Sequence, residues 1–570
     1  MTNTTGTPDP RAMALNNIPS IPPHQRKYRF LSTRMESLLF WLLLLAGLIP
    51  LMSHRFFVTL DGPAHLYSGM IIKSLLFDPH GTIGRLFTIN PFPVPNWTSH
   101  FLFTLFGTFL PGNLTEKAVI FLYLFFTPLI FRKLILFLRP KNRVLSWTMI
   151  LFVHNQNFYF GFFNFSFGVL FMFLTLWVYL AILRNQKKLH FLLLALLFLA
   201  LYFSHLMIFL VTLALIFLLS ACPLALSGGR GGLTISGGKR TARNLLRAGA
   251  AALPAVILTV MFLAGTNPLE NHPERHSFSQ LVEWVTAIRP LLALRYGFPW
   301  KSYTYLLFGV FLIMSITAAA IRYRDYRVKK RTSPEEPILL RLSPAPLFAL
   351  FSLGSLALLF ILPNTILLSE RLILLFYLFF ITTLALFRYP RWIHYTLASV
   401  IIILHISFTR MYTYTLGEYA ENATFVEETA REAEPGALLL PLNYNEKWIY
   451  MHISGYAGTH HSLALLENYE AGLSWFPVRW NHDYYETRFL DRSDASNTLH
   501  LCDNYIHPDL PATFSLTRND GTPEIIPYIL VILPGDKASP QIPSCARGIL
   551  DASYTAVREN SFCILFKAVE

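Results

Sequence analysis

Long apolar runs alternate with short polar and basic segments from Met35 to Arg410. Most runs have about 20 residues, which is the length an α-helix needs to cross the ~30 Å hydrocarbon core of a bilayer. The pattern predicts apolar segments at 37–53, 99–112, 117–138, 144–161, 165–184, 189–204, 206–224, 245–265, 303–321, 345–362, 367–387 and 393–410. We therefore expect an all-α polytopic membrane domain with about 11–13 transmembrane helices.

Basic residues form clusters between these runs, and the clusters suggest how the chain is oriented. They lie at 139–143, 184–188, 230–247, 322–331 and 388–391. Cytoplasmic loops of membrane proteins are enriched in Lys and Arg. The run at 99–112 is short for a span, and treating it as a re-entrant half-helix puts every cluster on the same side as the N-terminus. We expect a multi-pass protein of the inner (cytoplasmic) membrane with a cytoplasmic N-terminus.

The same topology gathers the remaining polar stretches on the extracytoplasmic side. These stretches are the loop 53–99, the turns 154–166 and 204–205, the loop 266–301, the turn 363–371 and everything after Arg410. Polar groups at membrane edges are costly without a partner or a role. A site fed from the lipid and open to water on one side is therefore expected where these stretches meet.

Two flanking regions differ in composition from the apolar core at 35–410. Residues 1–34 are rich in Pro, Asn and Thr and are expected to be a disordered cytoplasmic segment. In the tail at 411–570, the runs "GALLLPL", "PYILVILPG" and "FCILFKAV" predict strands, and "FVEETAREAE" predicts a helix. We expect the tail to form a small mixed α/β extracytoplasmic domain.

Overall composition agrees with a membrane protein and argues against nucleic-acid binding. Hydrophobic residues make up 53% of the chain and charged residues 14%, whereas soluble domains carry about 25% charged residues. The net charge is +14. Because the basic residues lie in short loops between apolar runs, they indicate topology rather than a nucleic-acid surface.

The stretch "TLDGPAHLYSGM", just after the first apolar run, admits two interpretations. Asp61 is a favoured helix N-cap, and Pro63 suits a first helical turn. On this structural interpretation, Asp61, His65 and Lys73 share the polar face of an amphipathic helix that lies in the membrane interface.

The chemical interpretation starts from the same spacing. Asp61 and His65 are four residues apart and point the same way on a helix. Such a pair can accept a proton from a hydroxyl group, or hold a divalent cation such as Mg²⁺ or Mn²⁺ through oxygen and imidazole nitrogen. The residue types alone leave both interpretations open.

The layout resembles the GT-C superfamily of integral-membrane glycosyltransferases. The first loop is long and carries an acid that leads into a helix. A proline-rich entry into a short second segment is matched by "PFPVPNWTSHFLFTLFGTFLP" (91–111). A Gly-x-x-Asn-Phe element of bacterial members is similar to "GFFNFSFGVL" (161–170). The resemblance implies a polyprenyl-phosphate-linked sugar donor, an extracytoplasmic glycan, lipid or protein acceptor, and an inverting transfer. It also implies that the first-loop acid, here Asp61, is the base. Many members have a second acid close by, whereas the next acid here is Asp78, so His65 is the candidate to replace it.

Substrate-binding candidates come from the outer polar stretches. Arg371 is the best phosphate ligand, because a guanidinium binds phosphate through a planar fork; alternatively it forms a local pair with Glu370 or anchors the chain at the membrane interface. The full set is His154, Asn155, Asn164, His205, His272, Glu274, Glu283, Glu370 and Arg371. For the others, the alternatives are satisfaction of turn backbone groups or a solvated loop. Aromatic and histidine residues at 452–461 and 475–485 suit either acceptor recognition or the core of the tail.

Two other classes of function remain. A transporter or lipid flippase would carry internal repeats and matching interrupted helices. Neither pattern is visible in the sequence, but the half-helix expected at 99–112 keeps this alternative open. A non-catalytic scaffold of the same layout would use Asp61 only to start a helix.

Overall fold

The computed structural model describes residues 32–184, 188–221, 237–265, 274–332, 344–459, 462–486, 514–535, 542 and 544–569. The predicted disordered segment up to residue 31 and the candidate His272 lie outside these ranges.

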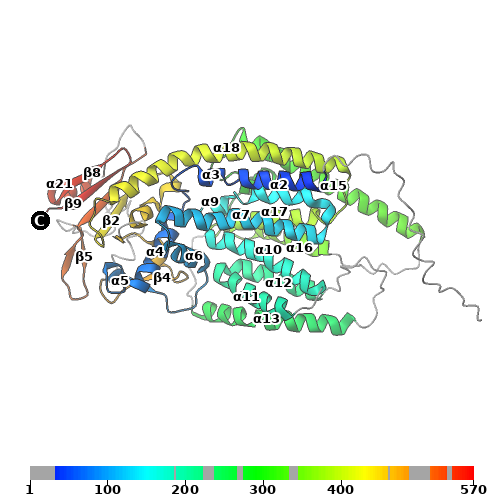
Figure 1. Cartoon of the computed structure of the whole chain (residues 1–570), viewed down its shortest axis with the longest axis horizontal. Helices are drawn as coiled ribbons and strands as arrows, with labels where there is room; N and C mark the ends of the chain where they lie inside the picture. Colours follow the sequence, from blue (N-terminus) through cyan, green and yellow to red (C-terminus); the bar gives the residue numbers. More distant parts are fainter. Residues whose placement is uncertain are drawn as a thin grey trace, which may run out of the picture.

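The described part is mostly helical, and its long helices run roughly along the long axis of the molecule (Figure 1). Within the described ranges, seven helical stretches are long and apolar enough to cross a membrane. The bundle contains α2 (Thr33–Ala46), α3 (Ile49–Met52), α7 (Gly112–Leu138), α10 (Phe163–Arg184), α11 (Lys188–Ser204), α12 (Leu206–Ala221), α13 (Gly237–Gly265), α15 (Trp300–Thr332), α16 (Pro344–Ile361), α17 (Leu368–Leu384) and α18 (Arg391–Ala430). These helices match the apolar runs of the sequence.

The run at 144–161 is an exception, because the prediction of one continuous span there is wrong. The chain instead forms the 3₁₀-helix η2 (Pro140–Trp147) and the short helices α8 (Thr148–Phe152) and α9 (Gln156–Tyr159). Every residue from 144 to 159 is buried. Irregular backbone at membrane depth is tolerated only where protein covers it, and this burial meets that condition.

Helix α6 (Thr98–Gly107) has the short length that was predicted for the run at 99–112. Its 10 residues rise about 15 Å, roughly half the thickness of the hydrocarbon core. It packs against α4 (Gly62–Phe77) and α7.

Helix α18 continues from the bundle to the C-terminal region as one element of 40 residues (Figure 1). The expected domain boundary between residues 410 and 411 therefore falls inside a helix. The separate helix predicted at "FVEETAREAE" is the last part of the same element, which ends at Ala430.

The C-terminal region contains the mixed sheet that its sequence predicts. The strands are β2 (Leu438–Asn443), β3 (Ala464–Leu465), β7 (Tyr528–Ile532), β8 (Tyr554–Glu559) and β9 (Cys563–Ala568), in the order β3-β2-β7-β9-β8. β2 runs parallel to β3 and β7, whereas β9 is antiparallel to β7 and β8. The three predicted strands are the central ones, and the fully buried run of β7 is typical of a central strand.

The first loop and the C-terminal region are packed into one unit. β1 (Phe87–Ile89) pairs antiparallel with β4 (Val478–Trp480), and α4 packs on the 3₁₀-helix η5 (Ile453–Thr459). Residues Gly62–Ile72 of α4 are all buried. The prediction of a helix was correct, but the prediction that it lies amphipathically in the interface is wrong, because the tail and α6 together cover its polar face.

A buried ion pair inside the bundle joins α2 to α7. The two terminal nitrogens of Arg132 each lie 2.7 Å from an oxygen of Glu36, and Trp147 Nε1 donates to the same carboxylate at 2.8 Å.

Arg132→Met is expected to destabilise the protein by about 3 kcal/mol, because it leaves a buried carboxylate without its main partner. Thermal unfolding in detergent measures this. The double variant with Glu36→Met should recover most of the loss, and a single variant as stable as wild type would contradict the expectation.

Candidate functional site

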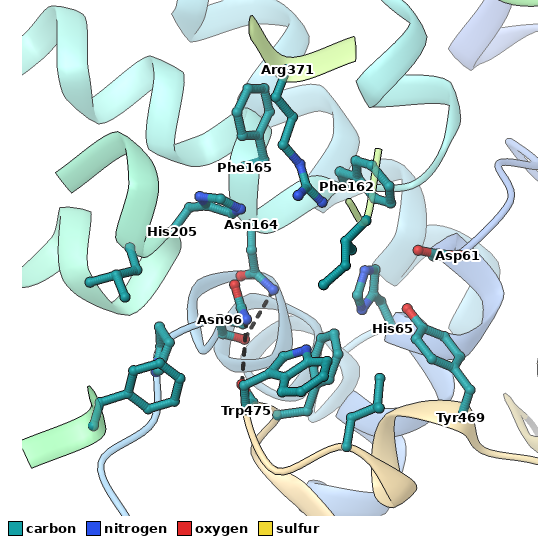
Figure 2. Close-up of a pocket in the computed structure, with 16 residues that line it drawn as sticks. Asp61, His65, Asn96, Phe162, Asn164, Phe165, His205, Arg371, Tyr469 and Trp475 are labelled. Carbon is teal, nitrogen blue, oxygen red and sulfur yellow. Dashed lines mark hydrogen bonds between the residues drawn. The ribbon is translucent and has the colours of Figure 1, made fainter. Parts of the chain in front are cut away.

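A cavity of about 370 Å³ lies where the bundle meets the C-terminal region (Figure 2). Its walls come from the first loop, the turn before α10, the turn between α11 and α12, the start of α17 and the tail. These are stretches that the sequence expected to meet at one membrane edge. Five of the candidate residues line the cavity, namely Asp61, His65, Asn164, His205 and Arg371.

Asp61 lies directly before α4, but its carboxylate does not cap that helix. Thr59 Oγ1 does so instead and accepts the backbone N–H of Gly62 at 3.1 Å. The capping interpretation of the Asp61 side chain is therefore wrong, and the carboxylate is available to the cavity. Burial raises the pKa of Asp61 above its ordinary value, and the neighbouring His452 opposes that rise.

The backbone at Asp61 is held by the turn that precedes α10. The N–H of Asp61 donates to the carbonyl of Phe160 at 3.2 Å. Gly161 has φ +78°, and a Cβ there would lie 2.6 Å from the Asp61 nitrogen. Glycine is needed here both for the left-handed conformation and for the close approach. The "GFFNF" element thus positions the candidate base.

A histidine and a second carboxylate lie behind Asp61. His452 Nε2 is 3.8 Å from Asp61 Oδ1, and its Nδ1 is 2.9 Å from Glu467 Oε1. The ring of Tyr469 stacks on His452 with centroids 4.5 Å apart. A histidine between two carboxylates can hold a proton beside Asp61.

Arg371 extends into the cavity from the start of α17 (Figure 2). Its guanidinium lies 4.6 Å from the ring centroid of Phe162 and 5.9 Å from that of Phe165. No carboxylate of the described residues is within ion-pair distance, so the alternative of a local pair with Glu370 does not hold. A guanidinium that lies against aromatic rings and has no ion pair in the described part of the chain suits an anionic ligand.

Asn164 and His205 also line the cavity, but they differ in their other contacts. The Asn164 side chain donates to the carbonyl of Asn96 at 3.0 Å and accepts the N–H of Ser99 at 2.8 Å. It therefore braces the entry to α6. The ring of His205 meets Phe165 edge-on, with centroids 5.2 Å apart.

His154 and Asn155 are buried but do not reach the cavity. His154 Nε2 bonds to the carbonyl of Gly47 at 3.0 Å. The Asn155 side chain caps α9 by accepting the N–H of Phe158 at 3.1 Å. Both side chains therefore form hydrogen bonds with backbone groups at turns, which is the structural alternative to ligand binding.

The three acids Glu274, Glu283 and Glu370 lie away from the cavity lining. Glu274 is exposed and bridges to Asn364 through its backbone. Glu283 forms an ion pair with Lys301. The Glu370 side chain is buried, and its carbonyl accepts from Asn157 at 2.8 Å, which fixes the chain next to Arg371.

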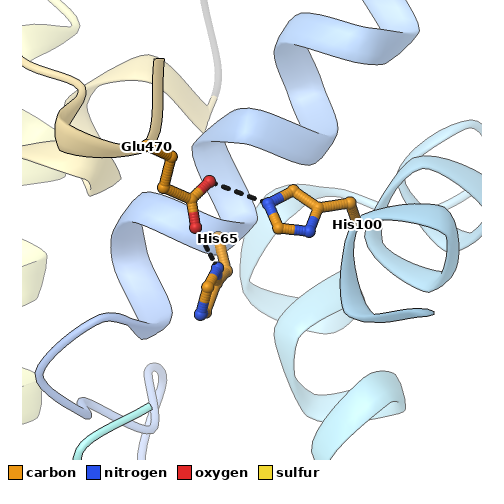
Figure 3. Close-up of side chains that lie close together, drawn as sticks. All are labelled: His65, His100 and Glu470. Atoms are coloured by element: carbon orange, nitrogen blue, oxygen red, sulfur yellow. Dashed lines mark hydrogen bonds and ion pairs between the residues drawn. The ribbon is translucent and has the colours of Figure 1, made fainter. Parts of the chain in front are cut away.

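Sequence reasoning missed several residues beside Asp61 and His65. These are His100, Glu467, Tyr469 and Glu470, whereas His452 belongs to the stretch 452–461 that the sequence singled out. Glu470 pairs with both His65 and His100 (Figure 3). Burial would raise the pKa of Glu470, but the two imidazoles hold it well below its ordinary value; in turn Glu470 raises the pKa of His65 against the effect of burial. The acid-rich "ENYE" in an aromatic tail segment was the only available signal.

A second hollow of about 630 Å³ lies between α6, α7, α10 and α11. Its lining is apolar except for Thr98. This hollow adjoins the cavity, because Asn96 lines the cavity and its neighbour Trp97 lines the hollow. The backbone N–H of Trp97 donates to the carbonyl of Phe203 at 2.7 Å. We call this second hollow the apolar groove.

Comparison with known proteins does not assign the chain to a group. No protein-family model matches it, and no curated protein matches its sequence. What the protein does must therefore be inferred from the geometry of the cavity and its surroundings.

Proposed function

We propose that this protein is a membrane glycosyltransferase of the GT-C type, which moves a sugar from a polyprenyl-phosphate donor to an extracytoplasmic glycan, lipid or protein acceptor. One observation carries the proposal: a single cavity is lined by a carboxylate, Asp61, and by an arginine, Arg371, that has no ion-pair partner among the described residues. A base and a phosphate-binding cation are the two charged groups that this reaction needs.

The proposed step is a single displacement. The acceptor hydroxyl gives its proton to Asp61 as its oxygen forms a bond to the anomeric carbon. The bond between that carbon and the donor phosphate oxygen breaks, and the phosphate leaves with the electron pair. Arg371 stabilises the charge that develops on the leaving phosphate. Attack and departure on opposite faces of the sugar invert the anomeric centre, as the GT-C resemblance implies.

The apolar groove supplies a place for the hydrocarbon chain of the donor. Its walls carry rings and aliphatic side chains from α6, α7, α10 and α11, which suits a prenyl chain. It abuts the cavity at Asn96 and Trp97. A lipid phosphate in reach of Arg371 would therefore have its chain beside the bundle rather than in water.

The reaction can be tested with the purified full-length protein in lipid nanodiscs. Polyprenyl phosphates that carry radiolabelled hexoses or pentoses are offered one at a time, with membrane extracts as acceptor source. Release of polyprenyl phosphate coupled to a labelled product is expected for one donor class. If no donor gives more release than the Asp61→Asn variant, the proposal fails.

Filling the apolar groove is expected to act on long-chain donors only. Ala200 lines the groove on α11, and Ala200→Trp places an indole where the chain would lie. We expect KM for a long-chain donor to rise at least tenfold, with little change for a short-chain analogue. Ala319→Trp on the exposed face of α15 is the matched control. Equal effects on both chain lengths would contradict a chain-binding groove.

A lipid flippase is the second candidate, because the groove and the interrupted run at 140–159 would also suit a lipid path. It makes the opposite prediction for Asp61: translocation of fluorescent lipid in proteoliposomes would persist in the Asp61→Asn variant.

We also propose the orientation of the chain in the inner membrane, with the cavity and the C-terminal sheet on the extracytoplasmic side. Reporter fusions at the C-terminus test it.

A further inference from the structure

Three buried side chains from separate parts of the chain lie close together next to the cavity, which one of them, His65, also lines (Figure 3). His65 comes from α4, His100 from α6, and Glu470 from the 3₁₀-helix η6 (Tyr469–Gly472). Their ligand-capable atoms all lie within 4.8 Å of one another. Glu470 Oε2 is 2.7 Å from His100 Nε2, and Glu470 Oε1 pairs with His65 Nδ1.

The hydrogen positions around His100 are constrained by its two neighbours. Nδ1 lies 2.9 Å from the carbonyl oxygen of Asn96, which can only accept, so Nδ1 carries the proton. In the neutral ring, Nε2 then presents a lone pair, and that lone pair faces a carboxylate oxygen. The arrangement is favourable only when a second cation, either a proton or a metal ion, lies between Nε2 and Glu470.

The contact with Asn96 also has the form of an outer-shell contact at a metal site. Metal-bound histidines usually donate their other ring N–H to a carbonyl or carboxylate, which fixes the ring and the ligating nitrogen. His100 makes this contact through Nδ1 and leaves Nε2 for the ion.

We propose that His65, His100 and Glu470 bind one divalent transition-metal ion of the Zn²⁺ type. Two imidazole nitrogens and one carboxylate oxygen form a donor set that Zn²⁺ favours, with one position left for a further ligand. Hard cations such as Mg²⁺ prefer oxygen ligands. The sequence had instead suggested Asp61 with His65 for Mg²⁺ or Mn²⁺, but Asp61 is not part of this cluster.

The ion would join α4, α6 and η6 and would hold in place the part of the cavity wall that His65 forms. It would tie the tail, through Glu470, to α4 and α6 of the membrane half. His65 is also a wall of the cavity and stands one helical turn after Asp61. The metal is therefore assigned a positioning role, which does not depend on whether the protein transfers sugar.

Metal content of the purified full chain tests the site directly. Elemental analysis after removal of loose metal should find about one zinc per chain. His100→Gln and Glu470→Gln should lower the zinc affinity at least tenfold. Glu467→Gln, an acid-to-amide change three residues from Glu470, is the matched control and should keep the ion. Replacing zinc by Co²⁺ should give visible absorption bands typical of a four-coordinate site.

A second readout uses wild-type protein alone, so that the test stands even if the variants do not fold. Stripping with a strong chelator should lower Tm, and adding Zn²⁺ back should restore it. The proposal is overturned if wild type holds less than a tenth of an equivalent of zinc and Tm does not respond, since two protonated histidines would then explain the cluster. It is also overturned if both variants hold as much zinc as wild type, or if only Mg²⁺ restores Tm.

Discussion

Asp61→Asn is expected to reduce sugar transfer by about 10²–10⁴-fold, the range that a lost general base typically costs. The variant should still fold, because the Asp61 carboxylate makes no capping hydrogen bond and Thr59 caps the helix in its place. An amide of the same shape keeps the side chain in position but cannot take the acceptor proton. The rate of polyprenyl phosphate release at saturating donor measures the effect.

Asp78→Asn is the matched control for that experiment. Asp78 is the next acid in the chain, is exposed and lies at the other end of the same helix. The same chemical change there should leave transfer within about twofold, since surface substitutions away from special features have small effects. Transfer by Asp61→Asn at the rate of Asp78→Asn would remove Asp61 from the mechanism.

Replacing Arg371 by Gln is expected to lower kcat/KM by about 10²–10³-fold, comparable to the loss of one donor to a developing oxyanion. The guanidinium lies against Phe162 and Phe165, and Glu370 and Asp61 act on its charge without forming an ion pair with it among the described residues. Its terminal nitrogens can therefore bind the donor phosphate. Arg371→Lys should restore part of the rate, because it keeps the charge but loses the planar fork.

Binding of the free product separates this role from a structural one. Polyprenyl phosphate should inhibit wild type and bind Arg371→Gln much more weakly, while Tm stays similar. Arg391→Gln is the control, because Arg391 is exposed at the start of α18. Arg371→Gln with an unchanged inhibition constant would show that the arginine does not contact the phosphate.

The helical framework follows from the sequence because the length of an apolar run is a local property. The run at 345–362 became α16 nearly residue for residue, and the run at 117–138 lies within α7, which begins earlier, at Gly112. The three central strands of the tail sheet were equally readable from short apolar runs bounded by turn residues. The prediction of one span at 144–161 was wrong. The run is apolar throughout because its residues are buried by protein on all sides, and not because they form one straight helix.

The cavity was predictable only in part. Asp61, Asn164, His205 and Arg371 were found because topology brings the ends of successive spans to the same membrane edge. His154 and Asn155 have the same sequence signal, but His154 bonds to the backbone of Gly47 between α2 and α3, and Asn155 caps α9. No rule of spacing distinguishes a polar side chain that satisfies a turn from one that faces a ligand.

The sequence by itself determined the membrane-length helices, the short α6, the helix after Asp61 and the three central strands of the tail sheet. Hydrophobic length, periodicity and turn residues act within a single segment, so a single chain reveals them. Only the tertiary structure decided what the Asp61 carboxylate and His65 contact. Their partners His452 and Glu470 come from about 400 positions away, on a tail that covers α4. Because contacts over that distance are not encoded in any one segment, the helix expected at the membrane surface is instead covered by the tail and forms part of the cavity wall.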